Sequence, residues 1–317
     1  MNPALSVIFF TSLSGAGYGL LFWTALAALT GEVPARALLV ATLVALVMAT
    51  IGLLSSTLHL GKPMRAWRAF SQWRTSWLSR EGVAAVLTYV PALVFAAALL
   101  PAMIAGHSQG APIGFNAMGK LLACVLMALS LATVHCTAMI YASLKPIPAW
   151  AHRLVAPGYL LFALLTGGLL LAAIATLDGA SLGNAPAMLA VWLAIALWLL
   201  KRRYWYDIDV PLPATRGDAV GLPGRQVSVF ERPHTEANYL TREMAFVVAR
   251  AHSRRLRLLA VLLFAIVPIL SMLPVWLFVH LDAAPWFVLA TVSALAGAFI
   301  ERWLFFAEAR HMVTLYY

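Results

Sequence analysis

The sequence predicts an all-α, polytopic membrane protein with eight transmembrane helices. Of its 317 residues, 62% are apolar and only 11% are charged, whereas a soluble domain is roughly a quarter charged. Several uninterrupted apolar runs reach the ~20 residues that a helix needs to cross a bilayer. The alternating ~10-residue segments of a transmembrane β-barrel are not seen in the sequence.

Hydropathy places the spans within one integral membrane domain that covers residues 1–317. The first apolar run has no basic residues before it, so it is interpreted as a span and not as a cleaved signal. The sixth span looks short, and Pro268 and Pro274 are expected to kink the seventh. The predicted spans are about 5–29, 37–60, 82–105, 117–143, 154–177, 186–201, 257–280 and 286–308.

The basic residues divide unevenly between the two membrane faces. One face, side A, carries both termini and the loops between spans 2 and 3, 4 and 5, and 6 and 7. All but two of the 22 Lys and Arg residues fall on side A, and only Arg36 and Lys120 fall on the opposite face, side B. Because basic residues favour the cytoplasmic face, both termini are predicted to be cytoplasmic in a bacterial inner membrane.

The loop between spans 2 and 3 carries an aromatic stripe at helical spacing, formed by Trp67, Phe70, Trp73 and Trp77. The stripe predicts an amphipathic helix that lies at the interface, with aromatic residues in the membrane and arginines on headgroups. It either serves as an interfacial anchor alone or also covers the entrance to a site for an isoprenoid ligand.

Several ionisable residues fall at the side A membrane boundary. His59 ends span 2. It either is simply solvated or serves a site as a proton acceptor near neutral pH. Glu81 opens span 3, where either the helix dipole favours a carboxylate or the residue relays protons. Glu301 and Arg302 lie a turn or two inside the boundary, where charges are costly unless paired or facing a polar cavity. Their common level predicts a functional site on side A.

His135 is expected near the middle of span 4, buried in the bundle. A haem with two histidine ligands would need a second histidine at matching depth on a facing helix. The other candidates lie near one edge or the other: His59, His311, His107 and His280. The sequence therefore predicts neither haem nor a metal site in this chain.

Residues 202–256 form a longer basic loop with four prolines. The segment is too small for a catalytic domain and suits the docking of another subunit, although a solvated loop that touches anionic lipid is the alternative. Residues 241–256 read as a helix that runs into span 7. The residues expected to dock a partner are Arg68, Arg74, Arg202, Arg203, Arg242 and His311.

Two motifs flank the loop between spans 2 and 3: LHLGKPMRAW at residues 58–67 and SWLSRE at residues 76–81. They resemble motifs of the membrane-anchor (C) subunit of the dimethyl sulfoxide reductase family, within the wider group of polysulfide-reductase-type anchors. Residues 141–150 and the last span, with Glu301 and Arg302, look like further matching blocks. The long basic loop departs from the shortest members of the family.

The resemblance implies an anchor without haem that oxidises menaquinol or another quinol. It also implies an iron–sulfur subunit and a molybdopterin catalytic subunit docked on the Lys/Arg-rich side, with the lipid bilayer as surroundings and no nucleic-acid partner. His59 and Glu81 match the histidine and glutamate of the family's quinol site, where His59 takes a proton that Glu81 relays outward. The expected quinol-binding set is completed by Arg65, Trp67, Glu301 and Arg302.

Two other functions are considered. A secondary transporter or channel would place polar groups at mid-membrane, whereas the charges here gather at one edge. A haem-carrying, cytochrome-type anchor would show a b-type spectrum. Exported catalytic partners, which are common in the wider group, would place side A outside the cell, against the charge bias.

Overall fold

The computed structural model describes residues 4–58, 60–106, 115–210, 214–231, 248–278 and 281–316. Across these ranges the regular structure is entirely helical, and eight helices are long and apolar enough to cross a membrane. The predicted all-α, polytopic membrane fold is confirmed.

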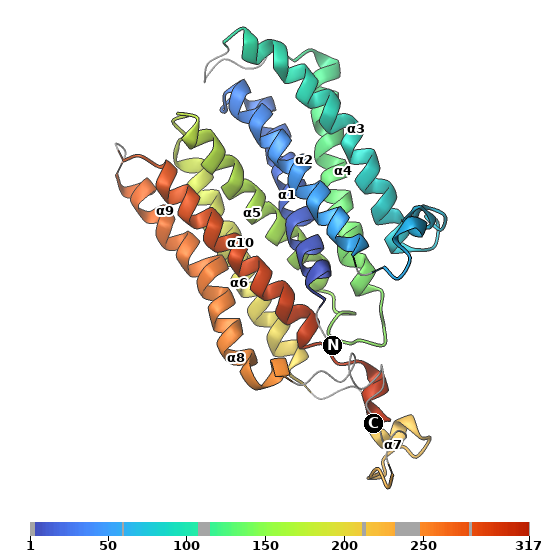
Figure 1. The fold of residues 1–317 in the computed structure, drawn as a ribbon. Helices are drawn as coiled ribbons and strands as arrows, with labels where there is room; N and C mark the ends of the chain where they lie inside the picture. Colours follow the sequence, from blue (N-terminus) through green and yellow to red (C-terminus); the bar gives the residue numbers. More distant parts are fainter. Residues whose placement is uncertain are drawn as a thin grey trace.

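The spans follow one another with short connections (Figure 1). They are α1 (Leu5–Thr30), α2 (Ala35–Thr57), α3 (Trp77–Ile104), α4 (Ala117–Ala142), α5 (Val155–Leu177), α6 (Asn184–Ile208), the continuous run of α8 (Val248–Val261), η3 (Leu262–Ile266) and α9 (Val267–Leu277), and α10 (Ala284–Ala307). Three short helices lie between or after them: η1 (Pro63–Phe70), α7 (Arg216–Ala219) and η4 (Met312–Leu315).

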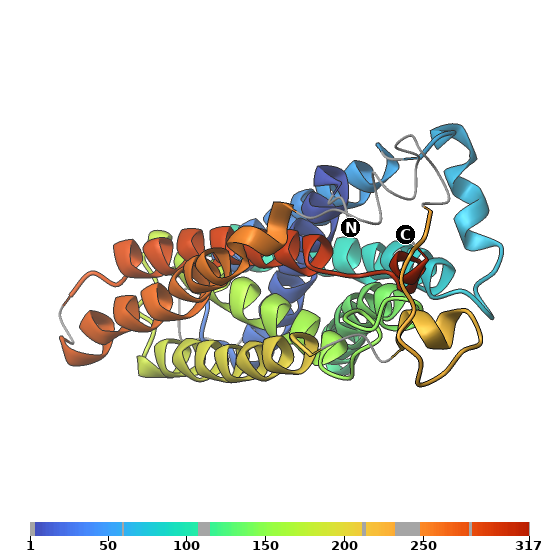
Figure 2. The ribbon, with the colours of Figure 1, turned by 90° about the horizontal axis from the view of Figure 1, so that it is seen from below.

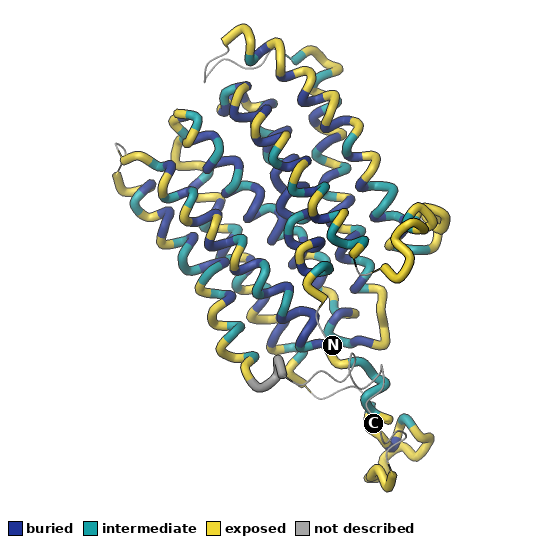
Figure 3. The backbone as a smooth tube through the Cα atoms, viewed as in Figure 1, coloured by how far each residue is buried: buried dark blue, intermediate teal, exposed yellow. Residues whose placement is uncertain are grey.

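The spans pack as two groups. Helix α1 packs against α2 and α4, and α3 packs against the same two helices, so α1–α4 form a ring in which α1 and α3 lie opposite each other. Helices α5, α6, α8–α9 and α10 form the second group, and α1 joins the two groups through α5 (Figure 1). Buried residues line the inner faces of both groups, while exposed residues follow their outer faces (Figure 3).

The contact between α1 and α5 depends on two glycines. A Cβ added to Gly167 would lie 2.2 Å from the carbonyl carbon of Gly19, and one added to Gly19 would lie 1.9 Å from the carbonyl oxygen of Ala163. The two backbones therefore touch, as small residues allow where helices cross in membranes.

Helix α3 begins at Trp77, earlier than the predicted start at residue 82. Glu81 therefore lies in the second turn of the helix and does not open it. Because the helix dipole acts mainly within the first turn, the dipole no longer accounts for a carboxylate at this position.

The sixth span is not short, because α6 continues to Ile208. In these last turns Lys201, Tyr204 and Trp205 are buried, whereas Arg202 and Arg203 are exposed. The charges of residues 201–203 lower the hydropathy, so the predicted span ends at residue 201. The helix nevertheless continues, because its inward face stays buried. Arg202 and Arg203 thus belong to α6 and not to a loop.

The seventh span contains a π-helical turn, η3, directly before α9. Pro268 lies at the start of α9 and has no N–H to donate to the preceding turn. A π turn is a common local answer to such a break in the helical hydrogen-bond ladder. Pro274 lies inside α9, which ends shortly afterwards at Leu277. Of the helix predicted over residues 241–256, the part from Val248 is present, and residues 241–247 lie outside the described ranges.

The loop between α2 and α3 contains a helix, as predicted, but η1 is a short 3-10 helix that holds only Trp67 and Phe70 of the aromatic stripe. Trp73 follows in a turn and Trp77 already belongs to α3. The segment projects sideways from the bundle and is largely exposed (Figures 1 and 3).

Both termini lie at the same end of the bundle, as the loop pattern predicts (Figure 1). The C-terminal segment is held there by two contacts: the Met312 amide donates to the Pro146 carbonyl at 2.9 Å, and the Tyr316 hydroxyl donates to Ala219 of α7 at 3.1 Å. Figure 2 shows α7 beside the C-terminus. On the opposite end, Arg36 pairs with Asp178 at 2.7 Å.

Candidate functional site

Glu81 is buried in α3, with 5% of its surface exposed. Its Oε1 atom has no hydrogen-bond partner within the described part of the chain. Buried polar atoms nearly always have a partner, and a buried carboxylate without one is costly. The position therefore suits a group that meets a ligand hydroxyl, a water or a proton.

Glu81 lies near residues of two other helices of the ring formed by α1–α4. Its charge acts on Tyr18 of α1 and on Cys136 and Tyr141 of α4. Next to it, a Cβ added to Gly82 would lie 3.2 Å from the ring of Phe70. The end of η1 thus packs against α3 at the residue next to Glu81.

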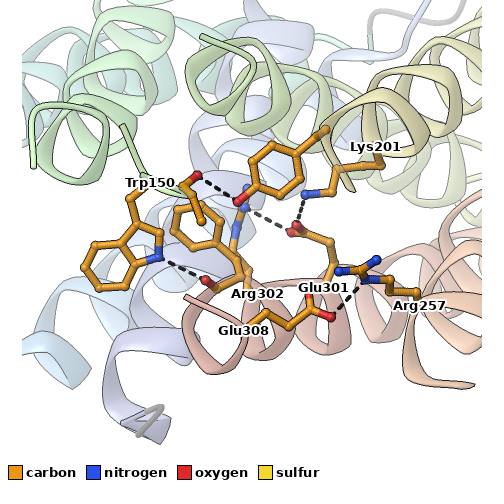
Figure 4. Close-up of polar contacts among 9 residues, drawn as sticks. Trp150, Lys201, Arg257, Glu301, Arg302 and Glu308 are labelled. Atoms are coloured by element: carbon orange, nitrogen blue, oxygen red, sulfur yellow. Dashed lines mark hydrogen bonds and ion pairs between the residues drawn. The ribbon is translucent and has the colours of Figure 1, made fainter. Parts of the chain in front are cut away.

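A second group of buried charges lies in the other half of the bundle (Figure 4). Glu301 of α10 forms an ion pair with Lys201 of α6, and Arg302 Nη1 lies 3.0 Å from Glu301 Oε2. The Arg302 guanidinium lies 3.6 Å from the ring centroid of Tyr159. The side chains around this triad enclose a cavity of only ~10 Å³, about enough for one water. Glu301 and Arg302 are therefore paired, as charges at this depth require, and leave no room for a quinone ring beside them.

The sequence alone does not single out Lys201. It is the first of three consecutive basic residues, Lys201, Arg202 and Arg203, which are typical of the cytoplasmic end of a span. The feature that could have identified it is spacing, which places Lys201, Tyr204 and Trp205 on one face of α6. In the structure, the Lys201 ammonium lies 3.9 Å from the Tyr204 ring centroid. A lysine on the aromatic face of a span is expected to point inward.

Arg257 forms a second set of ion pairs near this triad (Figure 4). Its Nε lies 2.9 Å from Glu308 Oε1, and its two terminal nitrogens lie 2.7 and 2.8 Å from the carboxylate of Asp209. Glu308 lies just past the end of α10. Burial raises the pKa of Glu308, and the Arg257 guanidinium opposes that shift.

An aromatic cluster lies beside the buried triad. Its members are Tyr141, Trp150, Tyr159, Phe305 and Phe306, with ring centroids 5.2–6.1 Å apart in the contacting pairs. The charges of Glu81 and of Arg302 both act on Tyr141, so this ring lies near both groups. The Trp150 indole donates to the Phe305 carbonyl at 2.9 Å and fixes the cluster to α10. Glu81 does not line the cavity at Glu301 and Arg302, so the structure does not join the three residues in one site.

The chain matches the DMSO reductase anchor subunit (DmsC) family over residues 1–307. It belongs to that family. It is also 36% identical to a sulfite dehydrogenase subunit from Allochromatium vinosum over 341 aligned positions, which cover 100% of this chain and 99% of that relative. The family resemblance of the motifs is confirmed, and the chain is a membrane anchor subunit of a molybdoenzyme family.

The other predicted quinol-binding residues of this anchor subunit lie in different settings. His59 lies outside the described residues. Arg65 and Trp67 are exposed on η1, with 66% of the Trp67 surface accessible. They are not enclosed with Glu81, and it is Phe70 that reaches α3.

The docking residues predicted for the anchor subunit are mostly accessible. Arg68, Arg74 and Arg202 are exposed, and Arg203 is exposed and bonded to Asp207 at 3.0 Å. His311 is half-buried and its Nδ1 accepts a hydrogen bond from the Val313 amide at 3.0 Å. Arg242 lies outside the described ranges. Docking by these residues stays a prediction.

His135 differs from the expectation of a buried histidine in the anchor subunit. It is exposed on the outer face of α4, where its ring meets Trp77 at 6.1 Å between centroids. The exposure follows from helical phase, because Thr133, Val134 and Thr137 take the inward positions. Within the described ranges, no group of three or more His, Cys, Asp or Glu residues could hold a metal ion.

Proposed function

We propose that this anchor subunit holds a quinol at Glu81 and passes its electrons to an iron–sulfur subunit docked on side A. The observation that carries the proposal is the buried Oε1 of Glu81, which lacks a hydrogen-bond partner in the described structure. A quinol hydroxyl can donate a hydrogen bond to such an oxygen.

The chemistry requires two protons and two electrons to leave each quinol. Glu81 accepts one proton from a quinol hydroxyl, and His59 is proposed to accept the other. The electrons pass to an iron–sulfur cluster of the docked subunit and then to the molybdopterin subunit. Oxidation then leaves the quinone with two carbonyl oxygens and no hydroxyl to donate.

The reverse direction is a second candidate. The relative from Allochromatium vinosum is named a sulfite dehydrogenase subunit, and a dehydrogenase withdraws electrons from its substrate. In that case the same site would reduce a quinone, and Glu81 would supply a proton where it otherwise accepts one. Redox assays in both directions on the purified complex distinguish the two.

The orientation is proposed from charge. Both termini and nearly all basic residues belong to side A, and a bacterial inner membrane with side A in the cytoplasm satisfies the positive-inside rule. The iron–sulfur and molybdopterin subunits would then dock at the cytoplasmic face. An alkaline phosphatase fused to the C-terminus should be inactive, and periplasmic activity would overturn this orientation without affecting the quinol site.

The function is tested by Glu81→Gln in the complete complex. General acid–base groups typically contribute 10²–10⁴-fold, so quinol-linked turnover should fall by at least ~100-fold. Turnover with a soluble redox dye, which bypasses the membrane site, should persist. Glu32→Gln, at an exposed position on side B, is the matched control. Normal quinol-linked turnover in an assembled Glu81→Gln complex would refute the proposal.

A further inference from the structure

The space inside the α1–α4 ring receives long polar side chains from the two opposite helices. Tyr18 projects from α1 and is 1% exposed, and Glu81 projects from α3 and is 5% exposed. Because α1 and α3 each pack against α2 and α4, side chains from both can meet between them.

Most other hydroxyls inside this ring are satisfied locally. The bonded ones include Ser14, Thr24, Thr42, Thr88, Thr133 and Thr137, each donating to a carbonyl one turn earlier at 2.6–3.0 Å. Among the described residues of the ring, buried oxygens without a partner occur on Ser12, Tyr18, Glu81 and Ser130. Ser12 and Ser130 have short side chains, whereas the side chains of Tyr18 and Glu81 are long enough to reach well beyond their own helices.

Tyr18 and Glu81 also lie near enough to interact electrostatically. The charge of Glu81 acts on the Tyr18 phenol, as does the neighbouring Tyr89. Tyr89 differs from Tyr18 because its hydroxyl lies 2.8 Å from Thr50 Oγ1 and is satisfied. The Tyr18 hydroxyl has no such partner in the described structure.

We propose that Tyr18 is a quinone-binding residue, whose hydroxyl donates a hydrogen bond to a ring oxygen of the quinone held beside Glu81. The inference rests on the proposed function of Glu81. The two groups are complementary, because a phenol hydroxyl can donate to a carbonyl oxygen while a carboxylate can only accept from a hydroxyl. Together they can hold a ring that alternates between quinone and quinol. Tyr18 keeps its proton throughout, so no atom is transferred to or from it.

Tyr18→Phe removes the hydroxyl and keeps the ring. In the complete complex, KM for a short-chain quinol should rise roughly tenfold, as expected for the loss of one hydrogen bond, while dye-linked turnover stays normal. Tyr159→Phe is the matched control, since Tyr159 is 3% exposed and its hydroxyl also lacks a partner in the described structure. That residue lies beneath Arg302 in the other half of the bundle, and its variant should keep the wild-type KM.

The outcomes separate the two proposals. A wild-type KM in Tyr18→Phe, or an equal rise in Tyr159→Phe, overturns the role of Tyr18 even if Glu81→Gln abolishes quinol turnover. Normal quinol turnover in Glu81→Gln overturns the proposed function itself. If Tyr18→Phe does not assemble, photolabelling of the wild-type complex with an azidoquinone gives the answer. Label on the α1 peptide around Tyr18 supports the inference, and label confined to peptides outside α1 overturns it.

Discussion

Lys201 of α6 and Glu301 of α10 form an ion pair inside the membrane-spanning bundle, where 5% and 1% of their side-chain surfaces are exposed. Glu301 is shared with Arg302, whose guanidinium also lies on the Tyr159 ring. One carboxylate thus serves two cations, and each cation also lies on an aromatic ring, Lys201 on Tyr204 and Arg302 on Tyr159. The triad ties α6, α10 and α5 together close to the side A boundary.

Loss of the carboxylate should destabilise this half of the bundle. Glu301→Gln leaves Lys201 buried without its counter-ion, and removing one partner of a buried pair typically costs about 3–5 kcal/mol. We expect a clearly lower Tm for the detergent-purified protein. Adding Lys201→Met to Glu301→Gln should recover part of the loss, because the unpaired ammonium is gone. If the two losses simply add, the two residues do not act as a pair.

The crossing of α1 and α5 should tolerate no added methyl group. Gly167→Ala would force a Cβ into the backbone of Gly19, so the helices must separate, and the Tm and the yield of folded protein should both fall. Gly15→Ala lies on the same α1 helix with nothing within 4 Å of the new Cβ. That variant should be neutral or slightly more stable, since alanine favours helix over glycine. Equal stability of the two variants would contradict the close crossing.

The C-terminal segment should loosen in acid. Burial lowers the pKa of His311, and its Nδ1 accepts the Val313 amide hydrogen bond only when neutral. A histidine with a depressed pKa contributes its stability above the unfolded value of ~6.5 and loses it as the pH falls below that value. Amide exchange at Val313 should therefore accelerate between pH 7.5 and pH 5.5, after correction for intrinsic exchange.

His311→Asn provides the control for this pH effect. Asparagine is a good helix N-cap and does not titrate. Exchange in this variant should depend much less on pH. The same acid response in His311→Asn would assign the effect to another group, such as Glu308.

Much of the architecture follows from the sequence because length and hydropathy alone decide what can cross a bilayer. The spans and the common side of both termini are cases of this kind. The errors fall where side-chain direction decides. Hydropathy ends span 6 at Lys201, although that lysine faces inward and is paired. His135 is expected inside, but helical phase turns it outward.

The candidate site could be predicted only in part. Glu81 stands out because a carboxylate near a membrane boundary needs an explanation. Its separation from Glu301 and Arg302 could not be foreseen, since residues at one depth can lie in different halves of a bundle. Tyr18 could not be predicted as a site residue from the sequence, because a tyrosine within an apolar run is typical of helix packing. It is distinguished by its buried hydroxyl, which has no partner in the described part of the chain.

The most direct test of the account is quinol binding at Glu81. A fluorescent quinol analogue of the hydroxyquinoline N-oxide class can be titrated into the assembled complex and into its Glu81→Gln and Glu32→Gln variants. The account predicts one saturable site per anchor subunit in the wild type and in Glu32→Gln. In Glu81→Gln the affinity should fall by at least roughly tenfold, as for the loss of a hydrogen bond to a charged group. Unchanged affinity in Glu81→Gln would contradict the account.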